Sequence, residues 1–323
     1  MRAVQRWLGL AGAVTGISLA LALGVGAATQ SEIYLLVVDQ QGVPVLDIKP
    51  SDIGIQEDAG SGAIVSVRRY GWPLKLTVLV DNGPGTADSL VHLRNGLNRL
   101  LDGIPRDIPV SLIATAPNPR WLIRESRDLV QIRNAIGRLT PDDHLARFSD
   151  ALGEYAGRLD DEFRKVEDDL TPYLPVLVSI ATTHADGSEV VRERNERMLL
   201  SLRKHRVWTN MIMVTPARGS NTPGAVSNLE VDEGQNSDIA HLVQEFTRGD
   251  YIPVSSGATS GLSSTVLPSL ARAIALRYLR QMTQHHVVFD RAPGAAGPMK
   301  NFRLTIANHP GARIIVSADG SMP

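Results

Sequence analysis

The fold is indicated most clearly by residues 74–85, which read Leu-Lys-Leu-Thr-Val-Leu-Val-Asp-Asn-Gly-Pro-Gly. The mostly apolar run ends at Asp81, and such a run is typical of a central strand that is buried on both faces of a parallel sheet. Leucines then recur at helical spacing over residues 87–101. A buried strand that leads into a helix predicts the first half of a strand-helix-strand unit.

The same alternation continues to about residue 282. Further apolar runs predict strands, which lie at 110–114, 121–124, 174–181 and 207–215, with a short edge strand at 251–254. Apolar residues at helical spacing predict helices, which lie at 129–139, 145–159 with an extension to 170, 190–205, 237–247 and 265–282. This order predicts an α/β fold with right-handed crossovers and a doubly wound, mostly parallel sheet.

Both flanks of this region are predicted to be β structure. Strand candidates lie before it at 33–39, 51–56 and 63–67, and after it at 286–290, 302–307 and 313–317. We therefore expect four parts along the chain. They are a signal peptide (1–28), a short N-terminal β unit (29–72), the α/β domain (73–283) and C-terminal β strands (284–323).

The first 28 residues have the character of an export signal. Arg2 and Arg6 form a positive start, residues 7–28 carry no charge, and the segment ends in small residues that suit cleavage near Ala27 or Ala28. This predicts a secreted or periplasmic protein. The alternative is an uncleaved N-terminal membrane anchor, because 22 uncharged residues are long enough to cross a bilayer. The glycine and alanine content favours cleavage.

Composition excludes several classes of protein. The chain is 43% hydrophobic and 21% charged, which is typical of a globular protein rather than a disordered one. It has no cysteine, which excludes disulfides, a thiol nucleophile and cysteine-ligated metal centres. Its net charge of −1, without a long basic run, argues against nucleic-acid binding.

Several stretches together resemble the bacterial secreted proteins that contain a von Willebrand factor A-type domain (VWFA-related proteins). The resemblance covers nearly all of the chain beyond residue 28 and places the A-type domain at 73–283. The stretches that carry it are an N-terminal strand, turn and acidic segment at 37–45 and 51–58, the first strand and metal loop at 76–85, the start of a later helix at 147–152, and closing strands at 283–289 and 302–306.

The residues that bind a metal ion in this family are mostly missing. Members with a working site carry Asp-x-Ser-x-Ser after the first strand, with a threonine and an aspartate from two further loops, and these supply the oxygen ligands that Mg²⁺ requires. Here Asp81 is retained, whereas Gly83 and Gly85 offer no side-chain oxygen. The resemblance places Ala146 and Ile180 at the other two positions. We therefore expect a degenerate site without a metal ion, and no cofactor.

The resemblance implies a non-enzymatic module that binds or scaffolds another protein in the envelope or extracellular space. Ligands of open α/β sheets bind at the carboxyl ends of the strands, so we expect three loops to converge there near Asp81. The predicted binding surface consists of Asp81, Asn82, Gly83, Asp142, Asp143, His144, Thr182, Thr183, His184 and Asp186. The sequence does not identify the partner, and a membrane is expected as a partner only if the N-terminal segment stays uncleaved.

Three alternatives to a metal-free binding module remain. Two of them place a site on the same surface, and the third has no specific site. The loops around Asp142 and Thr182 contain enough oxygen and nitrogen donors for a substitute metal site, but Thr140-Pro141 followed by two acids is typical of a helix start. An exported hydrolase-like α/β enzyme is the main functional alternative. His144 and His184 are its candidate bases, although no Gly-x-Ser-x-Gly motif accompanies them. The third is an envelope protein with a purely structural role.

Other motifs are interpreted as structural. His285 and His286 are adjacent on a predicted strand and should face opposite ways, so they are not expected to share a ligand. The segment 255–261 lacks the Lys-Ser/Thr ending of a phosphate-binding loop. The mixed charges of 189–206 indicate a solvated helix face, and the acids of 160–162 and 167–169 lack the spacing of a calcium loop.

Overall fold

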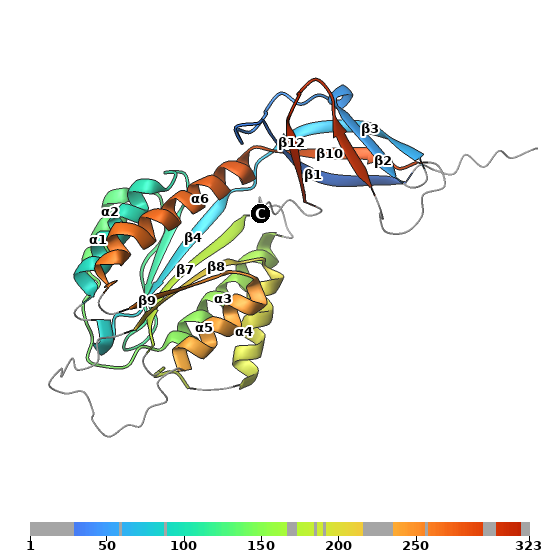
Figure 1. Cartoon of the computed structure of the whole chain (residues 1–323). Helices are drawn as coiled ribbons and strands as arrows, with labels where there is room; N and C mark the ends of the chain where they lie inside the picture. Colours follow the sequence, from blue (N-terminus) through green and yellow to red (C-terminus); the bar gives the residue numbers. More distant parts are fainter. Residues whose placement is uncertain are drawn as a thin grey trace, which may run out of the picture.

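The computed structural model describes residues 29–57, 60–86, 89–166, 173–183, 186–189, 192–215, 235–255, 258–292 and 302–317. It arranges them around two six-stranded sheets (Figure 1). The predicted signal peptide lies outside the described residues. Within them, no helix is long and apolar enough to cross a membrane.

The first sheet forms the centre of the α/β domain, in the spatial order β6-β5-β4-β7-β8-β9. Its strands are β4 (Leu74–Val80), β5 (Val110–Ala114), β6 (Arg120–Ser126), β7 (Leu174–Thr182), β8 (Trp208–Thr215) and β9 (Asp250–Ser255). The neighbours from β5 to β9 pair in parallel, whereas β6 pairs with β5 antiparallel. The sheet is therefore mixed.

Helices cover both faces of this sheet (Figure 1). One layer contains α1 (Leu90–Gly103), α2 (Leu129–Gly137) and α6 (Leu267–Met282), and the other contains α3 (Phe148–Val166), α4 (Arg192–Lys204) and α5 (Gln235–Thr247). Alternate side chains of β4 point to the two layers. Val78 packs into the core beneath α1 and α6, and Leu79 packs into the core beneath α3. Burial of each such side chain contributes about 2 kcal/mol.

Most helices and strands lie within a few residues of the predicted positions, with two larger differences. Helix α3 begins at Phe148 rather than Leu145 and is described only as far as Val166. The predicted extension to residue 170 lies outside the described residues. Helix α6 is preceded by a π-helical turn, Leu262–Val266, so the helical segment starts before the predicted Thr265.

The second sheet combines the two ends of the chain in the order β11-β2-β3-β10-β1-β12. Its strands are β1 (Gln30–Val38), β2 (Ile53–Glu57), β3 (Gly60–Tyr70), β10 (Gln284–Asp290), β11 (Arg303–Ile306) and β12 (Arg313–Ser317), with a short 3-10 turn, Pro50–Asp52, before β2. All pairs are antiparallel. The segments that the sequence divides as 29–72 and 284–323 thus share one sheet, with β10 between β3 and β1.

The predicted α/β class is confirmed. The finer prediction of a doubly wound, mostly parallel sheet is not confirmed. Strand β6 makes the α/β sheet mixed, and the sheet formed by the ends of the chain is antiparallel throughout. A continuous apolar run indicates a buried strand but not the direction of its neighbour, so the sequence pattern did not separate the two arrangements.

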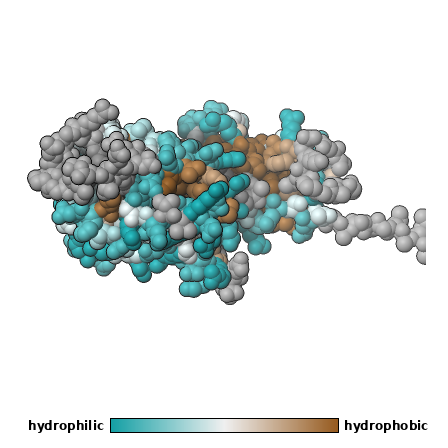
Figure 2. Space-filling view, turned by 90° about the horizontal axis from the view of Figure 1, so that it is seen from below, coloured by the Kyte–Doolittle hydropathy of each residue, from teal (hydrophilic) through white to brown (hydrophobic). Residues whose placement is uncertain are grey.

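The core of the antiparallel sheet is small and partly covered. Ile33, Leu35 and Phe289 are buried at its centre. Leu304 and Ile314, on the outer strands, are only half-buried. Figure 2 shows apolar side chains gathered over this sheet, whereas hydrophilic residues predominate over the α/β domain.

Two adjacent connections join the sheets. The first runs from β3 to β4 and the second from α6 to β10 (Figure 1). Tyr70 pairs with Gln284, and the backbone N–H of the buried Trp72 donates to the carbonyl of Gln281 at 3.0 Å. The two chain crossings are therefore hydrogen-bonded to each other.

Candidate functional site

Asp81 follows β4 and is buried at the carboxyl end of the sheet, with 2% of its surface exposed. One carboxylate oxygen, Oδ1, accepts a hydrogen bond from the backbone N–H of Gly83 at 2.8 Å. The other, Oδ2, accepts from the backbone N–H of Thr182 at 3.0 Å and from its hydroxyl at 2.6 Å. Both oxygens therefore have protein donors, and the carboxylate links the ends of β4 and β7.

Asn82 connects the neighbouring loops. Its side-chain amide donates to the carbonyls of Thr140 at 3.0 Å and Ala116 at 3.4 Å, and its side-chain oxygen accepts from the Ala116 N–H at 3.0 Å. Its own carbonyl accepts from the N–H of Asp142 at 2.8 Å. The structure thus brings Asp81, Asn82 and Gly83 together with parts of the Asp142 and Thr182 loops.

Asp186 lies in the third of the predicted loops, the one that follows β7, and it caps α3. Its Oδ1 accepts from the N–H of Phe148 at 2.9 Å, and its Oδ2 accepts from the N–H of Ser149 at 3.0 Å and from the Ser149 hydroxyl. The N–H and hydroxyl of Ser188 also donate to Oδ1, at 3.0 and 2.7 Å. A carboxylate at this place satisfies free N–H groups and complements the helix dipole, which explains why α3 begins at Phe148.

The exposed part of the predicted surface is the Asp142 loop. The Asp142 carboxylate accepts from the N–H of His144 at 2.9 Å and contacts the His144 ring nitrogen Nδ1 at 2.8 Å. Burial raises the pKa of Asp142, but these contacts with His144 outweigh burial and hold that pKa below its ordinary value. Asp143, His144 and Leu145 are exposed, with 76% of the His144 side chain open to solvent.

The third loop contributes less to the surface than predicted from the sequence. Thr182 and Asp186 are buried, and Thr183 is half-buried with its N–H donating to the carbonyl of Val214 at 3.1 Å. His184 lies outside the described residues.

Comparison with solved structures finds similar folds. A von Willebrand factor type A structure from Catenulispora acidiphila aligns with a TM-score of 0.46 at 10% identity, covering 89% of this chain and 72% of the other. An aerotolerance-related membrane protein from Bacteroides fragilis aligns with a TM-score of 0.41 at 13% identity, covering 63% and 98%. For the conserved hypothetical protein BatB from Bacteroides thetaiotaomicron the values are 0.40 and 13%, covering 62% and 99%.

The chain resembles von Willebrand factor A-type domains. No family model and no curated protein sequence matches the chain.

At the position where the predicted resemblance places a metal site, Asp81 is the one residue that offers a side-chain oxygen. A side chain added at Gly83 would place its Cβ 3.2 Å from Ala146 N, His144 O and Asp81 Oδ1, so a serine at this position would be tightly packed. Ala146 and Ile180 are buried and have no side-chain oxygen. Among the described residues, no group of three histidine or acidic side chains is placed to hold an ion.

Two other motifs from the sequence are structural in the described part. His285 is buried in the antiparallel sheet with Nε2 3.3 Å from the carbonyl of Leu46, whereas His286 faces the other way and pairs with Glu32 at 2.8 Å. On α4, Arg192 and Glu196 form an ion pair at 3.0 Å on an exposed face. The acids 167–169 and residues 256–257 lie outside the described residues.

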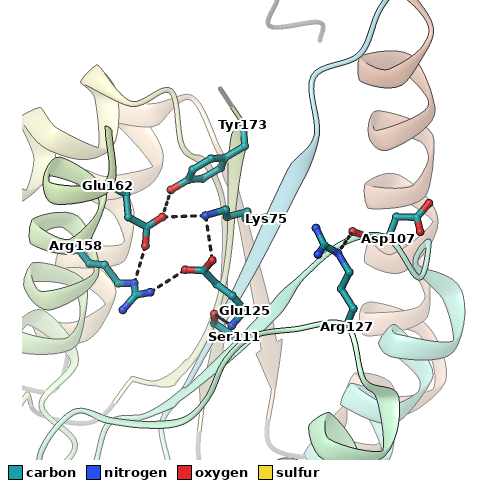
Figure 3. A network of polar contacts seen from close by, with 8 residues as sticks. All are labelled: Lys75, Asp107, Ser111, Glu125, Arg127, Arg158, Glu162 and Tyr173. Atoms are coloured by element: carbon teal, nitrogen blue, oxygen red, sulfur yellow. Dashed lines mark hydrogen bonds and ion pairs between the residues drawn. The ribbon is translucent and has the colours of Figure 1, made fainter. Parts of the chain in front are cut away.

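The sequence analysis did not predict a polar cluster that lies at the end of the sheet opposite to Asp81, where β4 begins (Figure 3). We call it the charge ring, and it consists of Lys75, Glu125, Arg158 and Glu162. Its members come from β4, β6 and α3, so no local motif joins them. The one signal in the sequence was Lys75, a charged residue inside an otherwise apolar strand.

Contacts in and beside the charge ring shift the pKa of Glu125, which is part of the ring, and of Tyr173, which is hydrogen-bonded to it. Burial raises the pKa of Glu125, but hydrogen bonds from Arg158 and Lys75 outweigh burial and hold that pKa below its ordinary value. Burial, together with the hydrogen bond to Glu162, raises the pKa of Tyr173. Glu125 is thus held charged and Tyr173 protonated near neutral pH.

Proposed function

We propose that this chain is an exported, non-enzymatic protein-binding module of von Willebrand factor A type that works without a metal ion at Asp81. Its partner is another protein of the envelope or extracellular space, and the contact surface is the loop Asp142–Leu145. The observation that supports this most directly is the hydrogen bonding of Asp81. Gly83 and Thr182 use both oxygens of its carboxylate, while the neighbouring loop stays exposed.

The Asp142–Leu145 loop is suited to recognition because it is exposed but firmly held. Asn82 holds one end of it, through the carbonyl of Thr140 and the N–H of Asp142. At the other end, the carbonyl of Ala146 accepts from the N–H of Gly187 at 2.8 Å. A loop fixed by a rigid scaffold loses little conformational entropy when a partner binds.

The chemistry of the loop favours a protein partner. Asp143 and His144 offer polar groups, and Leu145 beside them has 38% of its surface exposed. A small apolar contact surrounded by polar groups is typical of protein interfaces. Export is supported by the sequence alone, through the uncharged segment 7–28 behind Arg2 and Arg6.

The alternative of a hydrolase-like enzyme has weaker support. His144 contacts the carboxylate of Asp142, as a general base is often oriented by an acid. Such a base also needs a nucleophile within hydrogen-bond reach. In the described part of the chain, no hydroxyl group is hydrogen-bonded to His144. The pair therefore lacks the third member of a catalytic set.

The proposal is tested by affinity purification from the exported fraction of cells that carry the protein. The bait is the chain from residue 29 onward, compared with Asp143→Ala/His144→Ala/Leu145→Ala. The matched control is Glu193→Ala/Glu196→Ala/Arg197→Ala, three exposed residues of α4. We expect one protein that is retained by the wild type and the control, lost from the loop variant, and unaffected by a chelator. Retention of every bound protein by the loop variant, or release by the chelator, would contradict the proposal.

A further inference from the structure

A cavity of about 450 Å³ opens beside the charge ring. It lies near the amino-terminal ends of the parallel strands, since its lining residue Lys75 is near the start of β4. Asp81, by contrast, follows the end of that strand. The two sites are therefore separated by roughly 20 Å along the strand. Cavities of this volume are large enough for a small organic molecule.

The charge ring forms one wall of this cavity, with charges of alternating sign (Figure 3). Arg158 donates to Oε1 of Glu125 and to Oε1 of Glu162, both at 2.8 Å. Lys75 donates to Oε2 of the same two carboxylates, both at 3.1 Å. Each carboxylate oxygen thus already faces a cation. Lys75 uses two of its three N–H donors in these bonds, and Arg158 two of its five, so donors remain for a ligand.

Two further cations give the cavity a positive charge. The ring itself is neutral, with two cations and two carboxylates. Arg127 and Lys165 also line the cavity and are exposed. Arg127 uses its Nε to donate to the carbonyl of Asp107 at 2.9 Å, which leaves the ends of its guanidinium group for a ligand. The excess of cations on the wall favours an anion, and a guanidinium fork matches a carboxylate.

The backbone at Glu125 is an independent observation that points to the same place. Its φ of 45° is in the left-handed region, which a residue with a side chain rarely adopts. The pairing of β5 with β6 is irregular beside it, and the Glu125 N–H donates to the hydroxyl of Ser111 at 2.9 Å instead of continuing the ladder. Strain and bulges of this kind are concentrated at binding and active sites, where they aim a side chain.

The remaining wall is apolar. Pro73, Leu74 and Pro109 line it together with Tyr173. Lys75 sits 4.1 Å from the centre of the Tyr173 ring, which helps to hold the ammonium group in place. We propose that this cavity binds a small organic anion, with its carboxylate held by Arg127, Arg158 and Lys165 and a flat apolar group against the prolines. This site is separate from the protein-binding loop and does not depend on it.

The test uses the chain from residue 29 onward and titration calorimetry, supported by thermal shift. The probes are benzoate, phenylacetate and indole-3-acetate, each compared with its neutral amide, and inorganic phosphate as a bare anion. We expect at least one carboxylate to bind, its amide not to bind, and phosphate to bind more weakly. Arg127→Ala/Lys165→Ala should weaken carboxylate binding by roughly tenfold or more, because the charge-assisted hydrogen bonds from both residues would be lost.

The control variant is Arg192→Ala/Arg197→Ala, which removes two exposed arginines of α4 and should leave binding unchanged. Circular dichroism checks that both variants fold as the wild type does. The proposal would be overturned if no carboxylate binds at millimolar concentration, if the amides bind equally well, if phosphate binds as tightly, or if the control loses as much affinity. The Asp143→Ala/His144→Ala/Leu145→Ala variant should bind the carboxylate normally, which separates this result from the proposed function.

Discussion

Two buried carboxylates, Asp81 and Asp186, hold the loops at the carboxyl end of the α/β sheet. A buried carboxylate is costly unless hydrogen bonds replace its water, and here backbone N–H groups and hydroxyls do so. Asp81 directly follows β4, and Asp186 lies in the loop after β7. Their burial was not predictable, because residue type and position do not show which loop covers which side chain. Among the described residues of the predicted surface, Asp143 and His144 are exposed, and Asp142 and Thr183 are half-buried.

Replacing Asp81 tests this structural role. Asp81→Ala should lower the free energy of unfolding by about 3 kcal/mol, because the N–H groups of Gly83 and Thr182 would stay buried without an acceptor. Urea denaturation measures the change. Asp143→Ala, on the exposed part of the neighbouring loop, should stay within about 0.5 kcal/mol of the wild type. Equal stability of the two variants would show that the Asp81 bonds contribute nothing.

His285 should make the antiparallel sheet sensitive to acid. Burial lowers its pKa below the ordinary value of 6.5, and the positive charge of Arg69 acts in the same direction. The unfolded chain then binds the proton more tightly than the folded one, so stability present above pH 6.5 is lost as the pH falls through the folded pKa. Between about pH 7.5 and 5, His285→Asn should lose less stability than the wild type. Identical losses in denaturation experiments at the two pH values would contradict this.

At the scale of helices and strands, prediction was most successful for the buried strands. Continuous apolar runs such as 74–80 and 174–182 mark them clearly. The antiparallel direction of β6 follows from the connection 115–119 after β5, which is too short for a parallel crossover. The start of α3 was not predictable, because Asp186 caps it from another loop. The charge ring was missed for the same reason.

Loss of this cap should affect the beginning of α3 most. Asp186→Ala removes acceptors for Phe148, Ser149 and Ser188, and should lower the free energy of unfolding by about 2 kcal/mol. Hydrogen exchange should become faster in the first turn of α3 before it does in the rest of the helix. Asp161→Ala, on an exposed face of the same helix, is the control and should change neither measurement. Uniform protection along α3 in the Asp186 variant would argue against the capping role.

At the scale of the whole molecule, the two ends of the chain form one structural unit. The sequence predicted six strand candidates in these segments but not their partners, since pairing depends on register rather than on local pattern. As a result, segments that are separate in sequence are interleaved in space, with β10 between β3 and β1. Two hydrogen-bonded connections then join this sheet to the α/β domain.

Truncation tests this arrangement. Removal of residues 284–323 takes away β10 and leaves the facing edges of β1 and β3 without partners. Residues 29–70 should then become sensitive to protease, while the α/β domain retains its own cooperative unfolding. Removal of 318–323 alone leaves β12 complete and should have no such effect. Protection of 29–70 in the longer truncation would show that the N-terminal strands fold independently.

The most direct test of the metal-free account is calorimetric titration of the chain from residue 29 onward with Mg²⁺ and Mn²⁺. The carboxylate of Asp81 already accepts three hydrogen bonds, and the other ligand positions have no side-chain oxygen to offer. We therefore expect no submillimolar binding of either ion, with the same result for the wild type and for Asp81→Ala. Submillimolar binding that Asp81→Ala abolishes would contradict the account.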